Sequence, residues 1–411
     1  MFYLIVSAIL IAFAILAYKN LKLALAILAG ILPLYLIRFE LGSLPTTLLE
    51  LLIIIIVVIW LTKYKSWKTK LAQYRKWFWP TVLLLLAATI GIFVAPDTLD
   101  ALGIWKAYFV EPMLLFLVLL TTLEKKEDLQ MLFQALAITA IVLSLIAIVQ
   151  YVTGFGIPAP WDIEGRVTSI FDYPNALGLF LAPIVGLSVV MLQEQRRALW
   201  LVTILLGIVA IVLAKTEAAL VAVPAGLLLT LLLSSAPKKT KILVLSIAVI
   251  LGAVLFAVSG TVRSKILLED YSGQVRRSQW SETIELLQEK PIFGAGLNGY
   301  PTALEPYHDP TFYEIFQYPH NIILNIWSEL GVLGLIAVVW LAWLVLKTMK
   351  DCFASKTGSQ HSKLLLAAFA ALMIMAIHGL VDVPFFKNDL AVMTMMMLAV
   401  VAQKEDPATK E

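Results

Sequence analysis

The chain has few charged residues for its length. Of its 411 residues, 14% are Asp, Glu, Lys or Arg, whereas 61% are hydrophobic and the mean hydropathy is +0.90. Water-soluble domains are usually about a quarter charged and about half apolar. The shortage of charge therefore excludes a large soluble domain. It predicts one integral membrane domain over residues 1–411.

Two further shortages narrow the function classes. The single cysteine, Cys352, excludes an internal disulfide framework and a cysteine metal site. The net charge of +3 is too small to indicate nucleic-acid binding. The first apolar segment has no basic leader and no small-residue cleavage site, so we expect it to stay as a span rather than to be removed as a signal peptide.

Long apolar runs fill most of the chain. A membrane-spanning helix needs about 20 apolar residues. The sequence therefore predicts an all-α, polytopic transmembrane helix bundle of about 12–13 spans. The candidate spans centre on residues 2–17, 23–37, 48–62, 78–95, 107–123, 129–152, 175–192, 198–214, 218–234, 242–259, 326–346, 364–380 and 390–402.

The basic residues alternate between the two sets of loops. One set and the C-terminal tail hold 21 Lys and Arg residues, and the other set holds 10. Because basic loops stay in the cytoplasm, the first set is predicted to be cytoplasmic. The N-terminus and residues 260–319, the longest polar interruption, are then predicted to lie outside.

Within this large external loop, residues 276–290 have helical periodicity. Trp280, Ile284 and Leu287 repeat at i, i+4 and i+7, which predicts an amphipathic helix lying on the membrane surface. Arg276 precedes Trp280 by one turn, so the two residues share a face. Pro291 is expected to end the helix.

Three glycines follow this helix, at positions 294, 296 and 299, and formally match G-x-G-x-x-G. A dinucleotide site requires the motif to follow a strand and open a helix. Here it follows a helix and a proline. We therefore predict a tight turn with close backbone approach instead of a dinucleotide site.

Ionisable residues occur within or beside the spans, near their predicted outer ends. Such residues are costly in a membrane and are usually functional. A transporter usually needs polar groups at the bilayer midplane, where none is predicted. For each residue, an interfacial charge that reaches water is the plain alternative. The ionisable residues within or beside the spans are Glu50, Glu111, Arg166, Lys215, Glu217, Glu329, His378 and Asp382.

Some of these residues allow two interpretations. His320 precedes a span and is either functional or a structural cap. Arg166 stands among three acids in residues 161–175 and is either functional or part of a surface ion pair. His378 and Asp382 are four residues apart, so they can pair on one helix face as a structural or a functional unit.

Four motifs together resemble the O-antigen ligase and O-antigen polymerase family. They are GRVTSIFDYPNALG (165–178), R-x-x-x-W (276–280), PIFGAGLNGY (291–300) and HNIILNIWSELGVLGL (320–335). The ending HGLVDVPFF (378–386) is also similar to that family's. The resemblance covers residues 161–386. The first spans share no quoted motif with the family and resemble it only in their general apolar character.

The resemblance implies glycosyl transfer from an undecaprenyl-diphosphate-linked glycan donor to a lipid or polysaccharide acceptor, at the outer face of a bacterial plasma membrane, without metal or cofactor. His320, Arg276 and Arg166 match the family's catalytic positions. Many members have a Ser-Arg pair where this chain has Thr216 and Glu217, and Lys215 is the candidate replacement cation. The remaining candidate substrate-binding residues are Arg277, Asn321, Glu329, His378 and Asp382.

The implied chemistry is an inverting displacement. Arginines would neutralise the diphosphate leaving group with bidentate contacts. His320 would take the proton of the acceptor hydroxyl, or hold the diphosphate as an imidazolium. Two alternatives remain open: a transporter of a small anion, and a non-catalytic scaffold for envelope assembly. The sequence does not separate ligase from polymerase.

Overall fold

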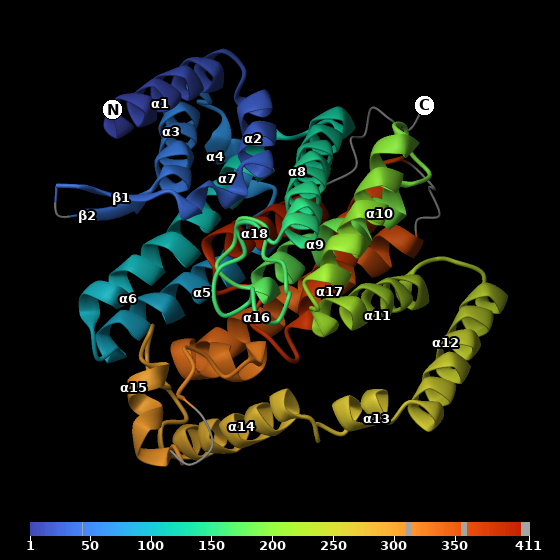
Figure 1. The fold of residues 1–411 in the computed structure, drawn as a ribbon. Helices are drawn as coiled ribbons and strands as arrows, with labels where there is room; N and C mark the ends of the chain where they lie inside the picture. Colours follow the sequence, from blue (N-terminus) through green and yellow to red (C-terminus); the bar gives the residue numbers. More distant parts are fainter. Residues whose placement is uncertain (43, 310–313, 355–359, 404–411) are drawn as a thin grey trace.

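The computed structural model describes residues 1–42, 44–309, 314–354 and 360–403. Helices packed side by side form the bulk of the molecule (Figure 1). The α-helices are α1 (Phe2–Lys19), α2 (Leu21–Gly30), α3 (Leu48–Lys63), α4 (Trp67–Ala72), α5 (Arg75–Val94), α6 (Thr98–Ile104), α7 (Glu111–Thr122), α8 (Lys126–Thr153), α9 (Pro174–Met191), α10 (Arg197–Leu213), α11 (Glu217–Leu233), α12 (Lys238–Val258), α13 (Gly260–Ile266), α14 (Tyr271–Glu289), α15 (Tyr300–Leu304), α16 (Ile322–Ala354), α17 (Gln360–His378) and α18 (Asn388–Ala402). Three shorter helical segments are η1 (Leu32–Leu36), η2 (Trp105–Val110) and η3 (Glu305–Tyr307).

The predicted all-α polytopic bundle is confirmed. Every predicted span falls on a helical segment, and 8 helices in the described ranges are long and apolar enough to cross a membrane. The second predicted span, residues 23–37, is wrong, because it is not a single helix. It divides into the 10-residue α2 and the 3-10 segment η1, which contains Pro33. Proline has no N–H to donate and clashes with the preceding helical turn, so it ends α2.

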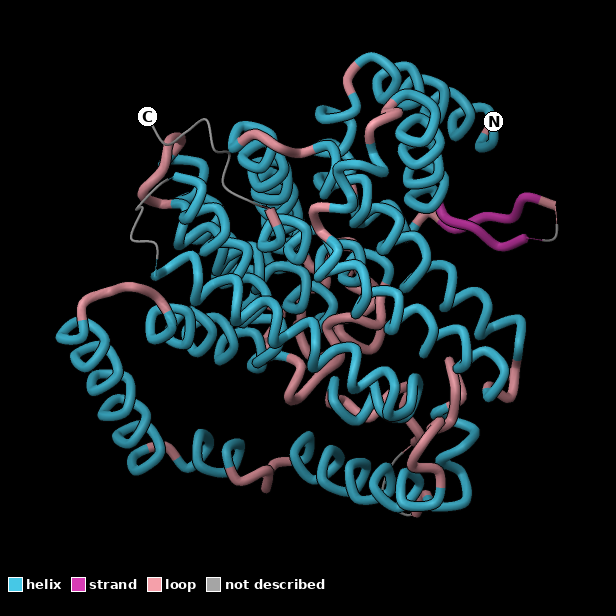
Figure 2. Tube along the Cα trace, turned by 180° about the vertical axis from the view of Figure 1, so that it is seen from behind, coloured by secondary structure: helices cyan, strands magenta, loops and turns pink. Residues whose placement is uncertain are grey.

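The polar motifs gather at one end of the bundle. This end, called here the α14 end, is where α9, α16 and α18 begin and α17 finishes. In Figure 1, α14 runs across it, and α13 connects α14 to α12. Figures 1 and 2 both show α12 standing apart from the other long helices, and none of its residues is buried.

The helix predicted over 276–290 exists, and Leu287 is buried as predicted, but the rest of its buried face differs from the prediction. α14 buries Gln279, Thr283 and Leu286, whereas Ile284 is 47% exposed. The apolar periodicity missed this face because polar side chains become buried when they are hydrogen-bonded. Gln279 donates to the carbonyl of Tyr318 (3.0 Å), and the hydroxyls of Thr283 and Tyr300 are 2.8 Å apart.

One hairpin interrupts the helices in the described ranges. β1 (Arg38–Leu41) pairs with β2 (Leu44–Thr47) in antiparallel register, with Arg38 opposite Thr47. Thr47 and Glu50 form a capping box at the start of α3. The sequence prediction contained no strand here. Each strand has only 4 residues, too few for alternation to be recognised beside long apolar runs.

The glycine turn after α14 is confirmed as a site of close backbone approach. Gly294 and Gly296 have φ of +67° and +80°. A Cβ at Gly296 would lie 2.5 Å from the backbone nitrogen of Ala95, and one at Gly294 would lie 2.3 Å from the carbonyl oxygen of Ser328. The turn therefore joins α14 to α5 and α16, a packing that only glycine permits.

We expect Gly296→Ala to destabilise the protein by at least about 2 kcal/mol, because left-handed backbone strain adds to the clash with backbone atoms. Thermal unfolding in detergent measures the effect. Gly252→Ala in α12 is the control, since a Cβ there meets nothing within 4 Å. Alanine stabilises a helix interior, so the control should unfold at the same or a higher temperature. Equal melting of Gly296→Ala and the wild type would contradict the packing argument.

Candidate functional site

His320 is held at the α14 end by side chains of α14. Gln279 and Trp280 donate to the carbonyls of Tyr318 (3.0 Å) and Pro319 (2.8 Å). His320 itself has a left-handed backbone, with φ of +47°, directly before α16. Asn321 caps that helix, because its Oδ1 accepts from the backbone N–H groups of residues 323 (3.0 Å) and 324 (3.1 Å). The imidazole is thus fixed at a helix start and remains 19% exposed.

Asp382 faces this imidazole. Its Oδ1 lies 3.6 Å from His320 Nδ1, and its Oδ2 accepts from Asn175 Nδ2 at 3.5 Å. The prediction that His378 and Asp382 share a helix face is wrong, because α17 ends at His378. Gly379 and Pro384 follow in sequence, and both residue types end helices. The turn they form directs Asp382 to His320.

The surroundings of Asp382 keep it ionised. Burial raises the pKa of its carboxyl group, but the facing ring of His320, the charge of His378 and the backbone N–H of Val383 lower it by more. The net pKa is below its usual value, and the side chain is only 3% exposed. An ionised Asp382 can fix the orientation and tautomer of His320.

This shift predicts a pH-dependent contribution to stability. A carboxyl group with a depressed pKa in the folded state stabilises the fold above its unfolded pKa of about 3.9, and that contribution is lost as the pH falls through the folded pKa. The melting-temperature difference between wild type and Asp382→Asn should therefore be constant from about pH 8 to 5 and shrink below about pH 4. The exposed Asp162→Asn variant serves as control. A difference already lost at neutral pH would refute the depressed pKa.

Arg276 lies on the same face of α14 as Trp280, as predicted. Its Nε donates to the carbonyl of Val381 (3.1 Å), next to Asp382, and one terminal nitrogen donates to the carbonyl of Ser272 (3.4 Å). His378 is buried close enough to Asp382 and Arg276 to experience both charges. Arg277 is exposed on the neighbouring face of the helix. Arg276 therefore adjoins His320 and Asp382 through one short backbone segment.

Arg166 joins the same group of side chains from the other side. It donates to Asn175 Oδ1 (3.1 Å) and to the carbonyl of Ala214 (3.1 Å), and it pairs with Glu164 at 3.4 Å. Since Asn175 also donates to Asp382, a continuous polar chain runs from Arg166 to His320. Arg166 therefore forms the ion pair that was one interpretation of it, and it is also connected to His320, as the functional interpretation requires.

Lys215 lies beside Arg166 at the junction of α10 and α11. Its Nζ donates to the carbonyl of Glu164 (2.6 Å), and its backbone is left-handed, with φ of +51°. The two residues after it point elsewhere. Thr216 is buried and donates to the carbonyl of Pro174 (3.2 Å), whereas Glu217 pairs with Lys265. Lys215 and Arg166 therefore both contact Glu164.

Glu329 has a different neighbour from the other candidates. It is 4% exposed, and its Oε2 accepts from the backbone N–H of Asn298 at 2.8 Å. That contact ties α16 to the glycine turn, two residues before α16 kinks at Gly331. This geometry makes Glu329 a contact between α16 and the glycine turn rather than a neighbour of His320.

Sequence reasoning missed two tyrosines and one lysine at the site. The ring of Tyr318 lies 5.0 Å from that of His320, and its hydroxyl is close enough to Tyr173 to interact with it. Burial, and then the nearby Tyr173 and Asp382, raise the pKa of Tyr318, so it stays neutral. The ammonium of Lys387 lies over Tyr173 (5.2 Å) and Phe171 (4.5 Å). The available signal was position: Tyr173 lies within a quoted motif, Lys387 directly follows one, and Tyr318 stands two residues before His320.

Metal binding is not indicated by clustering in the described ranges. There, no group of three or more His, Cys, Asp or Glu side chains is placed to hold a metal ion. The cationic groups at the site are instead Arg166, Arg276 and Lys215, with the imidazole of His320 between acidic and aromatic neighbours. Such a site suits an anionic ligand, since guanidinium groups bind phosphate oxygens in pairs.

Comparison with known proteins gives one match, which covers part of the chain. A search of curated proteins gives no match to the chain. A family model described as O-Antigen ligase matches residues 201–339, from α10 to the middle of α16. The match contains Lys215, Arg276 and His320 and leaves Arg166 and Asp382 outside. Over residues 201–339 the match supports the resemblance to the O-antigen ligase and polymerase family, and the 8 helices in the described ranges that are long and apolar enough to cross a membrane agree with a multi-pass membrane protein.

Proposed function

We propose that this protein transfers a glycan from an undecaprenyl-diphosphate-linked donor to an acceptor hydroxyl on a lipid or a growing polysaccharide. The ligase domain already implies glycan transfer in envelope polysaccharide assembly. The observation that carries the finer proposal is the polar chain Arg166–Asn175–Asp382–His320, with Arg276 beside it. It joins cations suited to a diphosphate with a base suited to a hydroxyl.

The cations would stabilise the leaving group. As the bond between the anomeric carbon and the diphosphate breaks, its electron pair goes to a phosphate oxygen, where negative charge develops. Arg276 and Arg166 would bind this diphosphate, with Lys215 or Arg277 as the third charge. Their backbone contacts hold both arginines in place before the reaction, and preorganised charge is what lowers a barrier of this kind.

His320 would accept the proton of the attacking hydroxyl. A proton on Nδ1 faces Asp382, which leaves the Nε2 lone pair free to act as the base. The acceptor oxygen forms its bond to the anomeric carbon opposite the departing diphosphate, so a single displacement inverts that carbon. Asn321, His378 and Asp382 act in this proposal by positioning His320 and its neighbours rather than by bonding to the reacting atoms.

The site would face the exterior. All the groups named lie at the α14 end, and basic residues are concentrated in the loops of the opposite end. By the positive-inside rule, that opposite end is cytoplasmic. Residues 260–319 would then be the large external loop within one membrane domain, with α14 above the outer leaflet.

Reconstitution tests the proposal. The purified chain in liposomes, supplied with an undecaprenyl-diphosphate-linked oligosaccharide and candidate lipid and polysaccharide acceptors, should release undecaprenyl diphosphate only when an acceptor is present. The anomeric configuration of the product reports inversion. Donor-independent uptake of a small anion would support a transporter instead. An inactive protein that nonetheless restores envelope assembly in cells would support a scaffold.

A further inference from the structure

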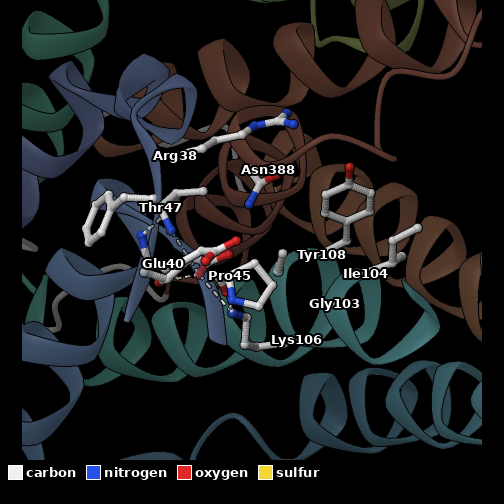
Figure 3. A pocket seen from close by; sticks show the side chains of 13 residues that line it. Arg38, Glu40, Pro45, Thr47, Gly103, Ile104, Lys106, Tyr108 and Asn388 are labelled. Atoms are coloured by element: carbon white, nitrogen blue, oxygen red, sulfur yellow. Dashed lines mark hydrogen bonds and ion pairs between the residues drawn. The ribbon is translucent and has the colours of Figure 1, made fainter. Parts of the chain in front are cut away.

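A cavity of about 430 Å³ lies at the same end of the molecule, apart from His320. It is open at the surface and enclosed by the β1–β2 hairpin, the α6–η2 segment and the start of α18 (Figure 3). Its volume falls within the ordinary range of small-molecule sites, roughly 300–1,000 Å³. The proposed transfer reaction leaves this cavity without a role.

The lining of the cavity mixes polar and apolar groups and carries balanced charge. Arg38 and Lys106 approach from opposite sides in Figure 3, with Asn388 between them, and the lining also includes Glu40 and Glu50. Glu50 is 5% exposed and pairs with Lys106 at 2.9 Å. Two cations and two carboxylates cancel, so the cavity favours an uncharged polar ligand over a diphosphate.

Two of the charged groups remain available to a ligand. Across the described ranges, neither the Arg38 guanidinium nor the Glu40 carboxylate has an ion-pair partner. They are two residues apart on β1, so both project from the same face of the strand. Thr47, opposite Arg38 in the hairpin, also lines the cavity. One hairpin face thus offers donors and acceptors to the same space.

This combination matches the chemistry of a sugar ring. Each hydroxyl of a sugar both donates and accepts, so it needs Arg or Lys donors and carboxylate acceptors together, with Asn able to serve both purposes. Tyr108, which lines the cavity, adds an aromatic face for the C–H side of the ring and a hydroxyl group.

Contacts between side chains connect the cavity to His320. Asn388 lines the cavity, and the preceding residue, Lys387, lies over the ring of Tyr173 at 5.2 Å. Tyr173 interacts with Tyr318, whose ring lies 5.0 Å from that of His320. Because several residues intervene, a ligand in the cavity would lie away from the bond being transferred, as distant units of a glycan do.

We propose that this cavity is a saccharide subsite that binds an uncharged sugar unit of the glycan, remote from the reacting carbon. The inference rests on the proposed function, since it assigns the cavity to the same substrate. Binding energy gained from a remote unit is used to position the reacting one, so the subsite would favour longer glycans. Donor and acceptor glycans share this chemistry, and the second measurement below shows which of the two occupies the cavity.

Filling the cavity provides a sharp test. Gly103 in α6 lines the cavity, and a Cβ built there meets nothing within 4 Å. Gly103→Phe should therefore fold and occupy the space. Leu102→Phe is the matched control, since Leu102 is 41% exposed in the same helix and does not line the cavity. Arg38→Ala is a second variant, which removes the exposed guanidinium.

The first measurement is sugar binding without turnover. The purified full chain in detergent is mixed with free disaccharides of glucose, galactose or N-acetylglucosamine, and saturation-transfer NMR reports binding. We expect the wild type and Leu102→Phe to bind at least one disaccharide, and Gly103→Phe and Arg38→Ala to bind it about tenfold more weakly or not at all. The absence of binding to the wild type, or undiminished binding to Gly103→Phe, would overturn the subsite.

The second measurement identifies the source of the sugar and separates the two proposals. If the subsite holds donor glycan, Gly103→Phe should raise KM several-fold for a multi-sugar donor and leave a one-sugar donor unaffected. If it holds acceptor glycan, the acceptor series should show this pattern. Sugar binding together with no transfer under any condition would refute the proposed reaction while leaving the subsite standing. Transfer that is equally impaired for short and long glycans would refute a remote subsite.

Discussion

Replacing His320 by alanine is expected to lower the rate of glycan transfer by about 100- to 10,000-fold, the usual contribution of a positioned general base. The imidazole sits beside Asp382, at the end of the polar chain from Arg166, and is still partly exposed. The variant should lose kcat with little change in KM for the donor, because the proton moves only in the transition state. Initial rates in liposomes measure both quantities.

His361→Ala is the matched control for this prediction. His361 lies near the beginning of α17, at the opposite end of that helix from His378, so it is far from the proposed reaction. It should transfer glycan at the wild-type rate. If His320→Ala is as active as this control, His320 is not the base. If instead KM for the donor rises sharply while kcat persists, the imidazole binds the diphosphate as a cation.

Replacing Arg276 by alanine should reduce transfer by about 100- to 1,000-fold, the cost of removing one preorganised charge from a developing anion. Arg276→Lys should retain part of this activity, because lysine keeps the charge but loses the bidentate geometry. The lysine variant also helps to separate the loss of positive charge from a disturbance of the neighbouring backbone. Arg276 donates to the carbonyl of Val381, so the alanine variant disturbs the segment that carries Asp382.

Arg263→Ala is the control for the arginine series. Arg263 is an exposed residue of α13, in the same polar region of the chain. It should have no effect on transfer. Thermal unfolding of all variants shows whether a loss of rate follows a loss of fold. Wild-type rates for Arg276→Ala in a stable protein would exclude this arginine from binding the diphosphate.

The order of helices was accessible from the sequence because a membrane imposes a simple rule. Every backbone polar group in lipid must be hydrogen-bonded within the segment, so a long apolar run becomes a helix. This rule located the segments now seen as α5, α8 and α16 without knowledge of their partners. The tight glycine turn after Pro291 also followed from local chemistry, because closely spaced glycines after a proline indicate a turn, whereas its partners in α5 and α16 did not.

The same local rules failed where burial depended on partners. The apolar face assigned to α14 was only partly right, because Gln279 and Thr283 are also buried, through hydrogen bonds to groups outside the helix. Asp382 was placed on a helix with His378 from the i, i+4 spacing alone, which overlooked the helix-ending residues Gly379 and Pro384. The β1–β2 hairpin was too short to produce a pattern.

The sequence by itself determined that the chain is an apolar helical membrane protein with its chemistry-bearing residues near one set of helix ends, because hydrophobic length and charge distribution are local properties. Only the tertiary structure decided which of those residues meet. Arg166, Asn175, Asp382 and His320 are separated by up to 216 positions and come together because α9, α16 and α18 begin, and α17 ends, at the same end of the bundle. Contacts at such separations arise from helix packing, which no local pattern encodes.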